Sequence, residues 1–124
     1  MAATSPEDVS DAFAAAINAG DVPAALDLWS EDAALVGADG QTVRGRAAIE
    51  AILQALIGNG TTVEIEVSHL ITAGEVAIAT GELRMRVPGH EALQSTTSVV
   101  VYARAPDGSW RVAIDAPWGL PAAG

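Results

Sequence analysis

The sequence contains no cysteine and no lysine, and these absences exclude several kinds of function. Without cysteine, the chain has no disulfides, no thiolate metal sites and no thiol nucleophiles. Six arginines stand against 16 acidic residues, which gives a formal net charge of −10 at pH 7. Because such a charge repels a phosphate backbone, we exclude nucleic acid as a partner.

Metal ligands and cofactor-binding loops are also scarce. The two histidines, His69 and His90, lie far apart, and the carboxylates around them lack the spacing of a ligand set. The sequence has neither a glycine-rich phosphate loop nor a Gly-x-Ser-x-Gly elbow. We therefore expect no metal and no cofactor.

Long hydrophobic runs are missing as well. Half of the residues are apolar, yet no run approaches the roughly 18 apolar residues that a membrane helix needs. Residues 1–6 lack the basic start and apolar region of a secretory signal, so we expect a cytoplasmic protein without membrane contact. The length of 124 residues suits one domain that spans residues 1–124.

Helical spacing of apolar residues dominates the first half of the chain. Ser5 can cap a helix that begins at Pro6, and Gly20 follows its end, so the pattern predicts a helix over residues 6–19. Residues 22–29 predict a second, shorter helix, and residues 33–36 a short strand. A third helix should follow Gly45, with one apolar stripe.

The apolar period changes to two at Val63, which is typical of half-buried strands. Turn sequences separate this first strand from strands over residues 76–87, 92–104 and 109–116. Helices followed by an antiparallel meander predict an α+β fold. We expect its core to contain seven large side chains, namely Phe13, Ile17, Trp29, Ile49, Leu53, Trp110 and Ile114.

Five segments carry a resemblance to a known family, and they are distributed over nearly the whole chain: Phe13–Asp21, Leu28–Ala33, Arg44–Ile49, Gly74–Ala77 and Asp107–Val112. In these segments the chain resembles ketosteroid isomerases, SnoaL-like cyclases and their relatives in the nuclear-transport-factor-like superfamily. The resemblance implies a cone-shaped barrel, in which a curved antiparallel sheet wraps around three helices and one hydrophobic pocket. Many activities share this scaffold, so the fold does not fix the function.

The catalytic residues of ketosteroid isomerases are absent from this sequence. That chemistry needs a carboxylate base and an acidic pair, a tyrosine and a protonated aspartic acid. When this chain is aligned with the isomerases, Phe13 occupies the position of the tyrosine and Gly37 that of the base. The position of the second aspartate falls near Val99 or Val100, so it is not an acid either. Unless Asp39 reaches in from its turn, steroid isomerisation by that mechanism is therefore not expected.

Three charged residues are the candidates for chemistry. The strand over residues 76–87 has one face that becomes polar along its length, and alignment with the isomerases directs this face into the cone, with Glu82 and Arg84 in the pocket. The alternative is that these two form an exposed cross-strand ion pair. Asp115 is the third candidate, but its parity is opposite to that of Trp110, so it enters the pocket only if a bulge or kink redirects it.

Four further residues are candidates for ligand binding: Phe13, Trp29, His69 and Trp118. His69 continues the inward parity of its strand and can act as a base near neutral pH, although a histidine at a strand end is often only hydrogen-bonded. Trp118 is a candidate lid over the pocket, and it can also simply close the end of the sheet.

We expect the ligand to be a small hydrophobic molecule of the terpenoid, steroid or polyketide kind. Two functions stay open: a cofactor-independent isomerase, cyclase or epoxide-hydrolase-like enzyme, or a non-catalytic ligand-binding or dimerisation module. A homodimer is expected too. If Glu82 and Arg84 point inward, then Leu83, Met85 and Val87 must point outward, and a second copy would cover them.

Overall fold

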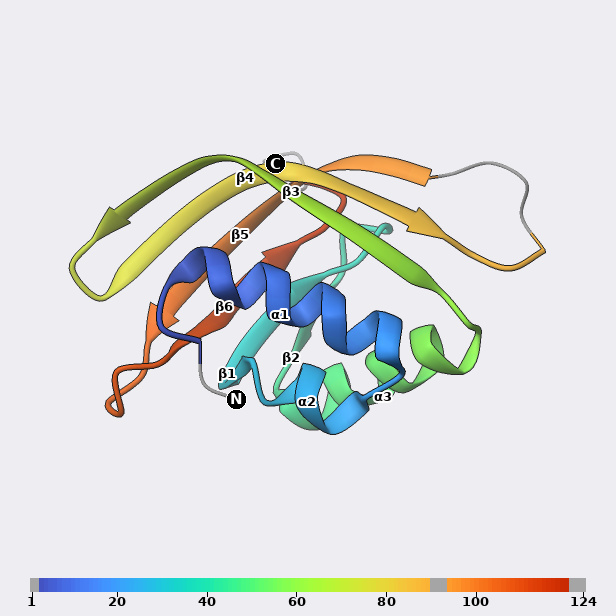
Figure 1. The fold of residues 1–124 in the computed structure, drawn as a ribbon, viewed down its shortest axis with the longest axis horizontal. Helices are drawn as coiled ribbons and strands as arrows, with labels where there is room; N and C mark the ends of the chain where they lie inside the picture. Colours follow the sequence, from blue (N-terminus) through green and yellow to red (C-terminus); the bar gives the residue numbers. More distant parts are fainter. Residues whose placement is uncertain (1–2, 90–93, 121–124) are drawn as a thin grey trace.

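The computed structural model describes residues 3–89 and 94–120. In this part of the chain three helices accompany one six-stranded sheet (Figure 1). The elements in chain order are α1 (Pro6–Ala19), α2 (Val22–Leu26), β1 (Trp29–Val36), β2 (Thr42–Arg44), α3 (Arg46–Gly58), β3 (Thr62–Ala73), β4 (Val76–Arg86), β5 (Gln94–Arg104) and β6 (Trp110–Ala116).

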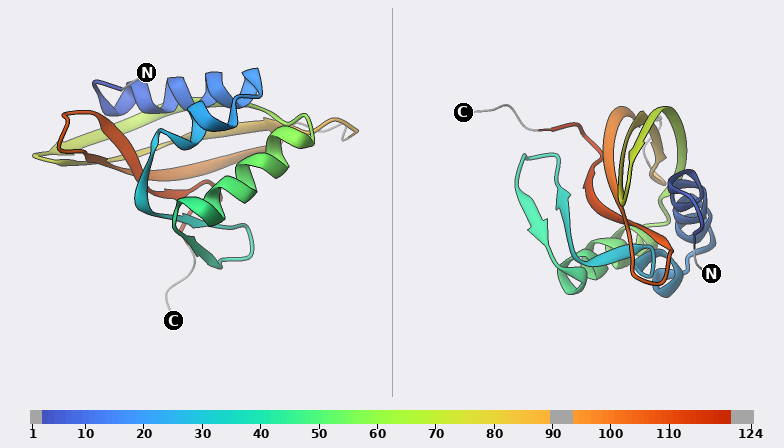
Figure 2. Two further views of the ribbon diagram at one scale, coloured as in Figure 1. Left: turned by 90° about the horizontal axis from the view of Figure 1, so that it is seen from below. Right: turned by 90° about the vertical axis from the view of Figure 1, so that its left-hand side faces the viewer.

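The strands lie in the order β2-β1-β6-β5-β4-β3, and all neighbours are antiparallel except β1 and β6. The sheet bends across its width, and all three helices lie on the same side of it (Figure 2). Helix α1 crosses the sheet, with α2 and α3 beside its C-terminal end (Figure 1). This arrangement confirms the expected α+β cone, and the cavity described below lies between the helices and the sheet.

Helix α1 begins and ends where the sequence predicts. The Ser5 hydroxyl accepts a hydrogen bond from the Asp8 amide, and Pro6 occupies the first turn, where its missing N–H costs nothing. At the other end Gly20 has a φ of +74° and donates to the carbonyls of Ala16 and Ile17, a conformation that favours glycine.

The second predicted helix is shorter than expected. Helix α2 ends at Leu26, and Trp29 is the first residue of β1 rather than the last of a helix. Strand β2 was not predicted, because its three residues have no alternation to reveal it. Strand β5 begins at Gln94 in the structure, and the first residues of the predicted strand, Ala92 and Leu93, lie outside the described residues, as does His90.

The predicted core is largely present. Ile17, Trp29, Ile49, Leu53 and Trp110 are buried in one cluster, and Phe13 is half-buried against it, but Ile114 is 40% exposed. The edge of the sheet is fixed to α1 by one amide side chain. Asn18 donates to the Val63 carbonyl at 2.9 Å and accepts from the Val63 N–H at 2.8 Å.

Two bulges change which side of the sheet a strand presents. In β3 the register jumps from Val67 opposite Gly81 to His69 opposite Thr80, which leaves Ser68 as the extra residue. Gly81 is required here, because a Cβ atom at this position would lie 2.2 Å from the Glu66 carbonyl oxygen. A side chain at Gly81 would therefore collide with the neighbouring backbone.

The second bulge lies in β6. Val112 pairs with Tyr102 and Ile114 pairs with Val101, so Ala113 is the extra residue. An extra residue reverses the alternation beyond it. Val112 faces the core, Ile114 turns to the outer face, and Asp115 turns inward. The bulge is the reason why the prediction of a buried Ile114 is wrong.

Candidate functional site

A cavity of two neighbouring chambers lies between the helices and the sheet. The outer chamber has a volume of about 360 Å³ and the inner chamber about 50 Å³. Four residues line both chambers and lie where the two meet: Phe13, Trp29, Leu83 and Asp115. The outer chamber has the size of a small-molecule site.

The outer chamber is lined almost entirely by apolar side chains. Helix α3 contributes Ile52, Leu53 and Leu56, and β4 contributes Leu83 and Met85. The described residues that line either chamber include no arginine and no histidine. Such a lining favours a ligand with an apolar body and offers nothing to neutralise an anion.

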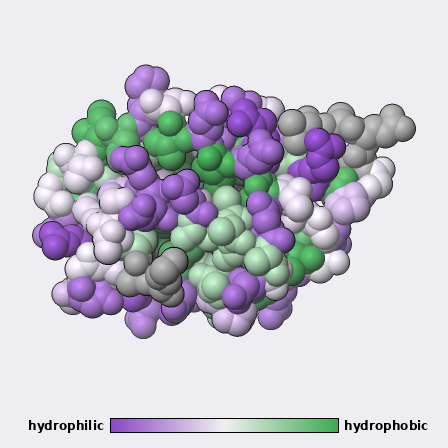
Figure 3. All heavy atoms as spheres, viewed as in Figure 1, coloured by the Kyte–Doolittle hydropathy of each residue, from purple (hydrophilic) through white to green (hydrophobic). Residues whose placement is uncertain are grey.

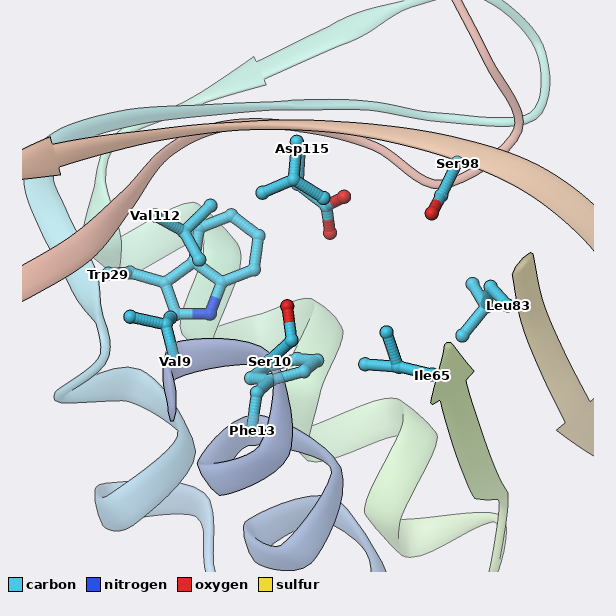
Figure 4. Close-up of a pocket in the computed structure, with 10 residues that line it drawn as sticks. Val9, Ser10, Phe13, Trp29, Ile65, Leu83, Ser98, Val112 and Asp115 are labelled. Carbon is cyan, nitrogen blue, oxygen red and sulfur yellow. The ribbon is translucent and has the colours of Figure 1, made fainter. Parts of the chain in front are cut away.

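Apart from Gln94, which lines the outer chamber, the polar side chains of the cavity line the inner chamber. Ser10 comes from α1, Ser98 from β5 and Asp115 from β6. Figure 4 shows the Asp115 carboxylate and the hydroxyls of Ser10 and Ser98 turned into the same space, with Trp29 on one side and Leu83 on the other. The site is therefore an apolar cavity with a small polar end.

Asp115 is the only carboxylate among the described residues that line the cavity. The residue is partly buried, and no hydrogen bond or ion pair from another described residue reaches its carboxyl group. Burial away from water disfavours the charged form and raises the pKa of Asp115 to about 7 from an ordinary value of 3.8. At neutral pH this group can therefore both accept and return a proton.

A hydrogen-bonded pair lies beside this carboxylate. The hydroxyls of Ser10 and Tyr102 are 2.5 Å apart, and both residues are buried. Burial raises the pKa of Tyr102, the nearby carboxylates, with Asp115 first among them, raise it further, and the bond to Ser10 lowers it in part. Tyr102 therefore keeps its proton at neutral pH.

The structure places three of the predicted ligand-binding residues at the cavity. Phe13 and Trp29 line both chambers, and their rings meet edge to face with centroids 5.8 Å apart. Trp118 lines the outer chamber and is 40% exposed, as a residue at the mouth would be. The buried Trp29 Nε1 has no hydrogen-bond partner among the described residues.

The prediction that Glu82 and Arg84 face the cavity is wrong. The Arg84 guanidinium lies 3.2 Å from Glu64, 3.5 Å from Glu66 and 3.2 Å from Glu82, all on the outer face of the sheet. The Ser95 hydroxyl donates to Glu82 at 2.6 Å, and this bond, followed by the Arg84 charge, lowers the pKa of Glu82. The opposite, apolar face of β4 packs inward because burying it releases water from apolar surface.

His69 also lies outside the cavity, contrary to its predicted inward position. The bulge at Ser68 reverses the alternation of β3, so that His69 is exposed opposite Thr80, with 3.4 Å between the histidine Nδ1 and the threonine hydroxyl. The bulge at Ala113 has the opposite effect on Asp115. It reverses the alternation of β6, so that Asp115, which would otherwise face outward, faces the cavity.

Sequence reasoning missed Ser10, Tyr102 and Ser98. Each has a detectable signal: Ser10 lies three residues before Phe13 and seven before Ile17, on the buried stripe of α1. Ser98 and Tyr102 share the inward parity of β5, where both are buried. A polar residue at a buried position of a repeating pattern is a stronger site signal than a charge on the polar face.

No metal or membrane site is evident in residues 3–89 and 94–120. Within these ranges no group of three or more histidine, aspartate or glutamate side chains is placed to hold a metal ion. No helix in these ranges is long and apolar enough to cross a membrane.

The family model of the SnoaL-like domain matches residues 10–113, and the chain therefore belongs to this family. Asp115 lies just beyond the matched residues, so the match itself does not assign it a role. A comparison with curated proteins finds no significant match.

Solved structures share the fold at low sequence identity. A candidate calcium/calmodulin-dependent protein kinase type II association domain from Thiobacillus denitrificans is 23% identical, with a TM-score of 0.78, over 96% of this chain and 99% of that one. An NTF2-like protein from Pseudomonas putida is 20% identical, with a TM-score of 0.73, over 89% and 80%. A ketosteroid isomerase-like protein from Erwinia carotovora is 15% identical, with a TM-score of 0.70, over 89% of each chain. These similarities establish the fold alone.

Proposed function

We propose that this protein binds a small hydrophobic molecule in the two-chambered cavity and that Asp115 moves a proton on it. The observation that carries the proposal is a lone carboxylate with a pKa of about 7 where the apolar outer chamber meets the small inner chamber. A base with a pKa near the working pH is well matched to proton transfer. The reaction class is thus a cofactor-independent isomerisation or cyclisation, and the cytoplasmic location stays a prediction.

The proposed step is a transfer between ligand carbon and the carboxyl group. The Asp115 carboxylate takes a proton from a carbon next to a carbonyl group, and the electron pair of the C–H bond moves toward the carbonyl oxygen. Asp115, now a neutral acid, returns the proton to the same or another carbon. Neither an oxidant nor a reductant is required.

Deuterium exchange tests this function without knowledge of the natural substrate. Cyclohexanone and decalone are incubated with the protein in deuterium oxide, and NMR follows deuterium entry next to the carbonyl group. We expect the protein to accelerate exchange and Asp115→Asn to abolish the acceleration. Glu82→Gln is the matched control, because it makes the same chemical change on the outer face. Equal exchange rates with and without protein would contradict the enzyme function.

A specific observation also supports the alternative function, a dimerisation module, although on a different face from the predicted one. Cross-strand pairing aligns Ile71, Ile78, Val101 and Ile114 in one row over β3 to β6 on the outer face of the sheet. Ile71 is 67% exposed, Ile78 44% and Ile114 40%. Figure 3 shows hydrophobic atoms gathered over the end of the β3–β4 hairpin. A contiguous exposed apolar row is typical of an interface.

The charge of this outer face favours a second copy as the partner. On this face strands β3 to β6 carry three glutamates, Glu64, Glu66 and Glu82, and three arginines, Arg84, Arg86 and Arg111, of which Arg111 also pairs with Asp107. Two chains that each carry a net charge of −10 can approach each other through a region that is much less acidic than the chain as a whole. We therefore propose a homodimer through the apolar row, in place of the predicted dimer through Leu83, Met85 and Val87, which line the cavity.

Sedimentation velocity at micromolar concentration tests the dimer. We expect a species of twice the monomer mass of 12.6 kDa. Ile78→Asp should give a monomer, because two carboxylates would be buried at the interface. Thr62→Asp adds the same charge at an exposed position opposite Arg86 and should leave the dimer intact. A wild-type monomer over the whole concentration range would contradict the proposed interface.

A further inference from the structure

The inner chamber contains a hydrogen-bond donor whose direction follows from the hydrogen bond between Ser10 and Tyr102. Tyr102 is 1% exposed, and Ser10 is the only partner of its hydroxyl among the described residues. If Ser10 donated to Tyr102, the tyrosine proton would remain buried without an acceptor, which is unfavourable. Tyr102 therefore donates to Ser10, and the Ser10 proton is free to point elsewhere.

The free proton of Ser10 can point into the inner chamber. Ser10 lines the inner chamber, and its hydroxyl faces that space in Figure 4. A hydroxyl that accepts one hydrogen bond becomes a better donor for the next, because such chains polarise one another. Ser10, supported by Tyr102, thus presents an enhanced donor at the polar end of an apolar cavity.

We infer that the inner chamber binds the carbonyl oxygen of a neutral ketone-like ligand through the Ser10 hydroxyl, while the apolar body of the ligand fills the outer chamber. This inference rests on the proposed function and names its substrate class. The chamber volume of about 50 Å³ suits a group of a few atoms rather than a ring system.

The surroundings disfavour the two charged classes of ligand. A carboxylate ligand would lie beside Asp115 in a cavity whose described lining has no cation. An ammonium ligand could pair with Asp115, but it has only donors and so offers no acceptor to the Ser10 proton. A carbonyl oxygen satisfies the Ser10 donor and adds no charge.

A matched ligand series tests the inference. Adamantanone, adamantane, adamantylamine and adamantane carboxylate share one rigid cage, and Trp fluorescence or calorimetry gives their affinities. Cyclohexanone and decalone, each with its hydrocarbon, extend the series to other shapes. We expect each ketone to bind about fivefold more tightly than its hydrocarbon, the usual worth of one neutral hydrogen bond. The amine and the carboxylate should bind more weakly than the ketone.

Three variants test the donor, and a fourth serves as control. Ser10→Ala should remove the preference for ketone over hydrocarbon, and Tyr102→Phe, which keeps the Ser10 hydroxyl, should reduce it. Ser98→Ala tests whether the other hydroxyl of the same chamber is the donor instead. Ser95→Ala removes a hydroxyl on the outer face of the sheet and is the control that should keep the preference. The infrared carbonyl band of bound adamantanone adds a direct readout, because losing the Ser10 donor should shift the band to higher frequency.

The outcomes separate this inference from the proposed function. A ketone preference that survives Ser10→Ala, or that disappears in Ser98→Ala instead, would overturn the inference while the cavity remains a binding site. Tighter binding of the amine than of the ketone would also overturn it. If no member of the series binds, hydrocarbons included, the proposed function fails as well.

Discussion

Replacing Asp115 with asparagine should make the protein more stable than the wild type at alkaline pH and leave the two nearly equal in acid. The folded protein holds the pKa of this carboxyl at about 7, against an ordinary value of 3.8. A carboxyl whose pKa rises on folding binds its proton more tightly in the folded state, so stability is lost as the pH rises from the unfolded to the folded pKa. Asparagine has no charge to bury.

The size of the effect follows from the same two values. Each pH unit between the pKa values corresponds to about 1.4 kcal/mol, so the gap amounts to at most about 4 kcal/mol. Water inside the cavity solvates the carboxylate and makes the measured effect smaller. The whole loss should fall between the ordinary pKa of 3.8 and the folded value of about 7, with little change above that.

Urea unfolding over a range of pH measures this difference directly. The free energy of unfolding of Asp115→Asn minus that of the wild type should be near zero in acid and increase through neutral pH, while contributions from the other carboxylates cancel. Glu82→Gln is the control: the pKa of Glu82 is lowered from its ordinary value of 4.5 in the folded state, so its contribution is present above that value and is lost only in acid. A flat difference curve for Asp115→Asn above pH about 5 would refute the argument and remove the basis for Asp115 as the base.

Three further predictions concern the scaffold and the ligand. Asn18→Asp should destabilise the protein more than Asn18→Ala, by about 1 kcal/mol or more in urea unfolding, because a carboxylate cannot donate to the Val63 carbonyl and would repel it. Gly81→Ala should cost about 2 kcal/mol or more because its Cβ would meet the Glu66 carbonyl, whereas Gly58→Ala, which has open space around it, should be neutral or stabilising; equal effects would contradict the bulge geometry. Adamantanone affinity measured by calorimetry should fall as the pH rises through about 7, because a ligand that displaces water disfavours charged Asp115; a constant affinity would show that the ligand does not reach the carboxyl group.

The sequence predicts the elements of this fold better than their orientation. The ends of α1 were predictable because Ser5 and Gly20 act locally, within a few residues of the bonds they make. Alternation in β4 separates its two faces correctly, but alternation alone does not say which face is inside. The hydrophobicity of each face shows which one is inside. The apolar face with Leu83 and Met85 lines the cavity, whereas alignment with the isomerases predicts that this face points outward.

The two bulges explain why the candidate site was only partly predictable. Periodicity assumes an unbroken register, and a single extra residue exchanges inside and outside for every residue beyond it. The bulge at Ser68 places His69 outside, and the bulge at Ala113 places Asp115 inside. Only one has a signal in the sequence, since Gly81 provides the room that the β3 bulge needs.

The position of Asp115 is best understood as a loss of stability that serves binding or chemistry. A leucine or valine at this position would match the apolar lining around it and would avoid the burial of an unpaired charge. A carboxyl group that only supported the fold would have hydrogen-bond or ion-pair partners, as the exposed Glu82 does. Asp115 instead faces a cavity with enough volume for a ligand, beside a serine whose donor is oriented by a buried tyrosine. Loss of stability at a group left free to meet a ligand is typical of a functional site. The proposed chemistry therefore has its support in the inner chamber rather than in the ion pairs of the outer face.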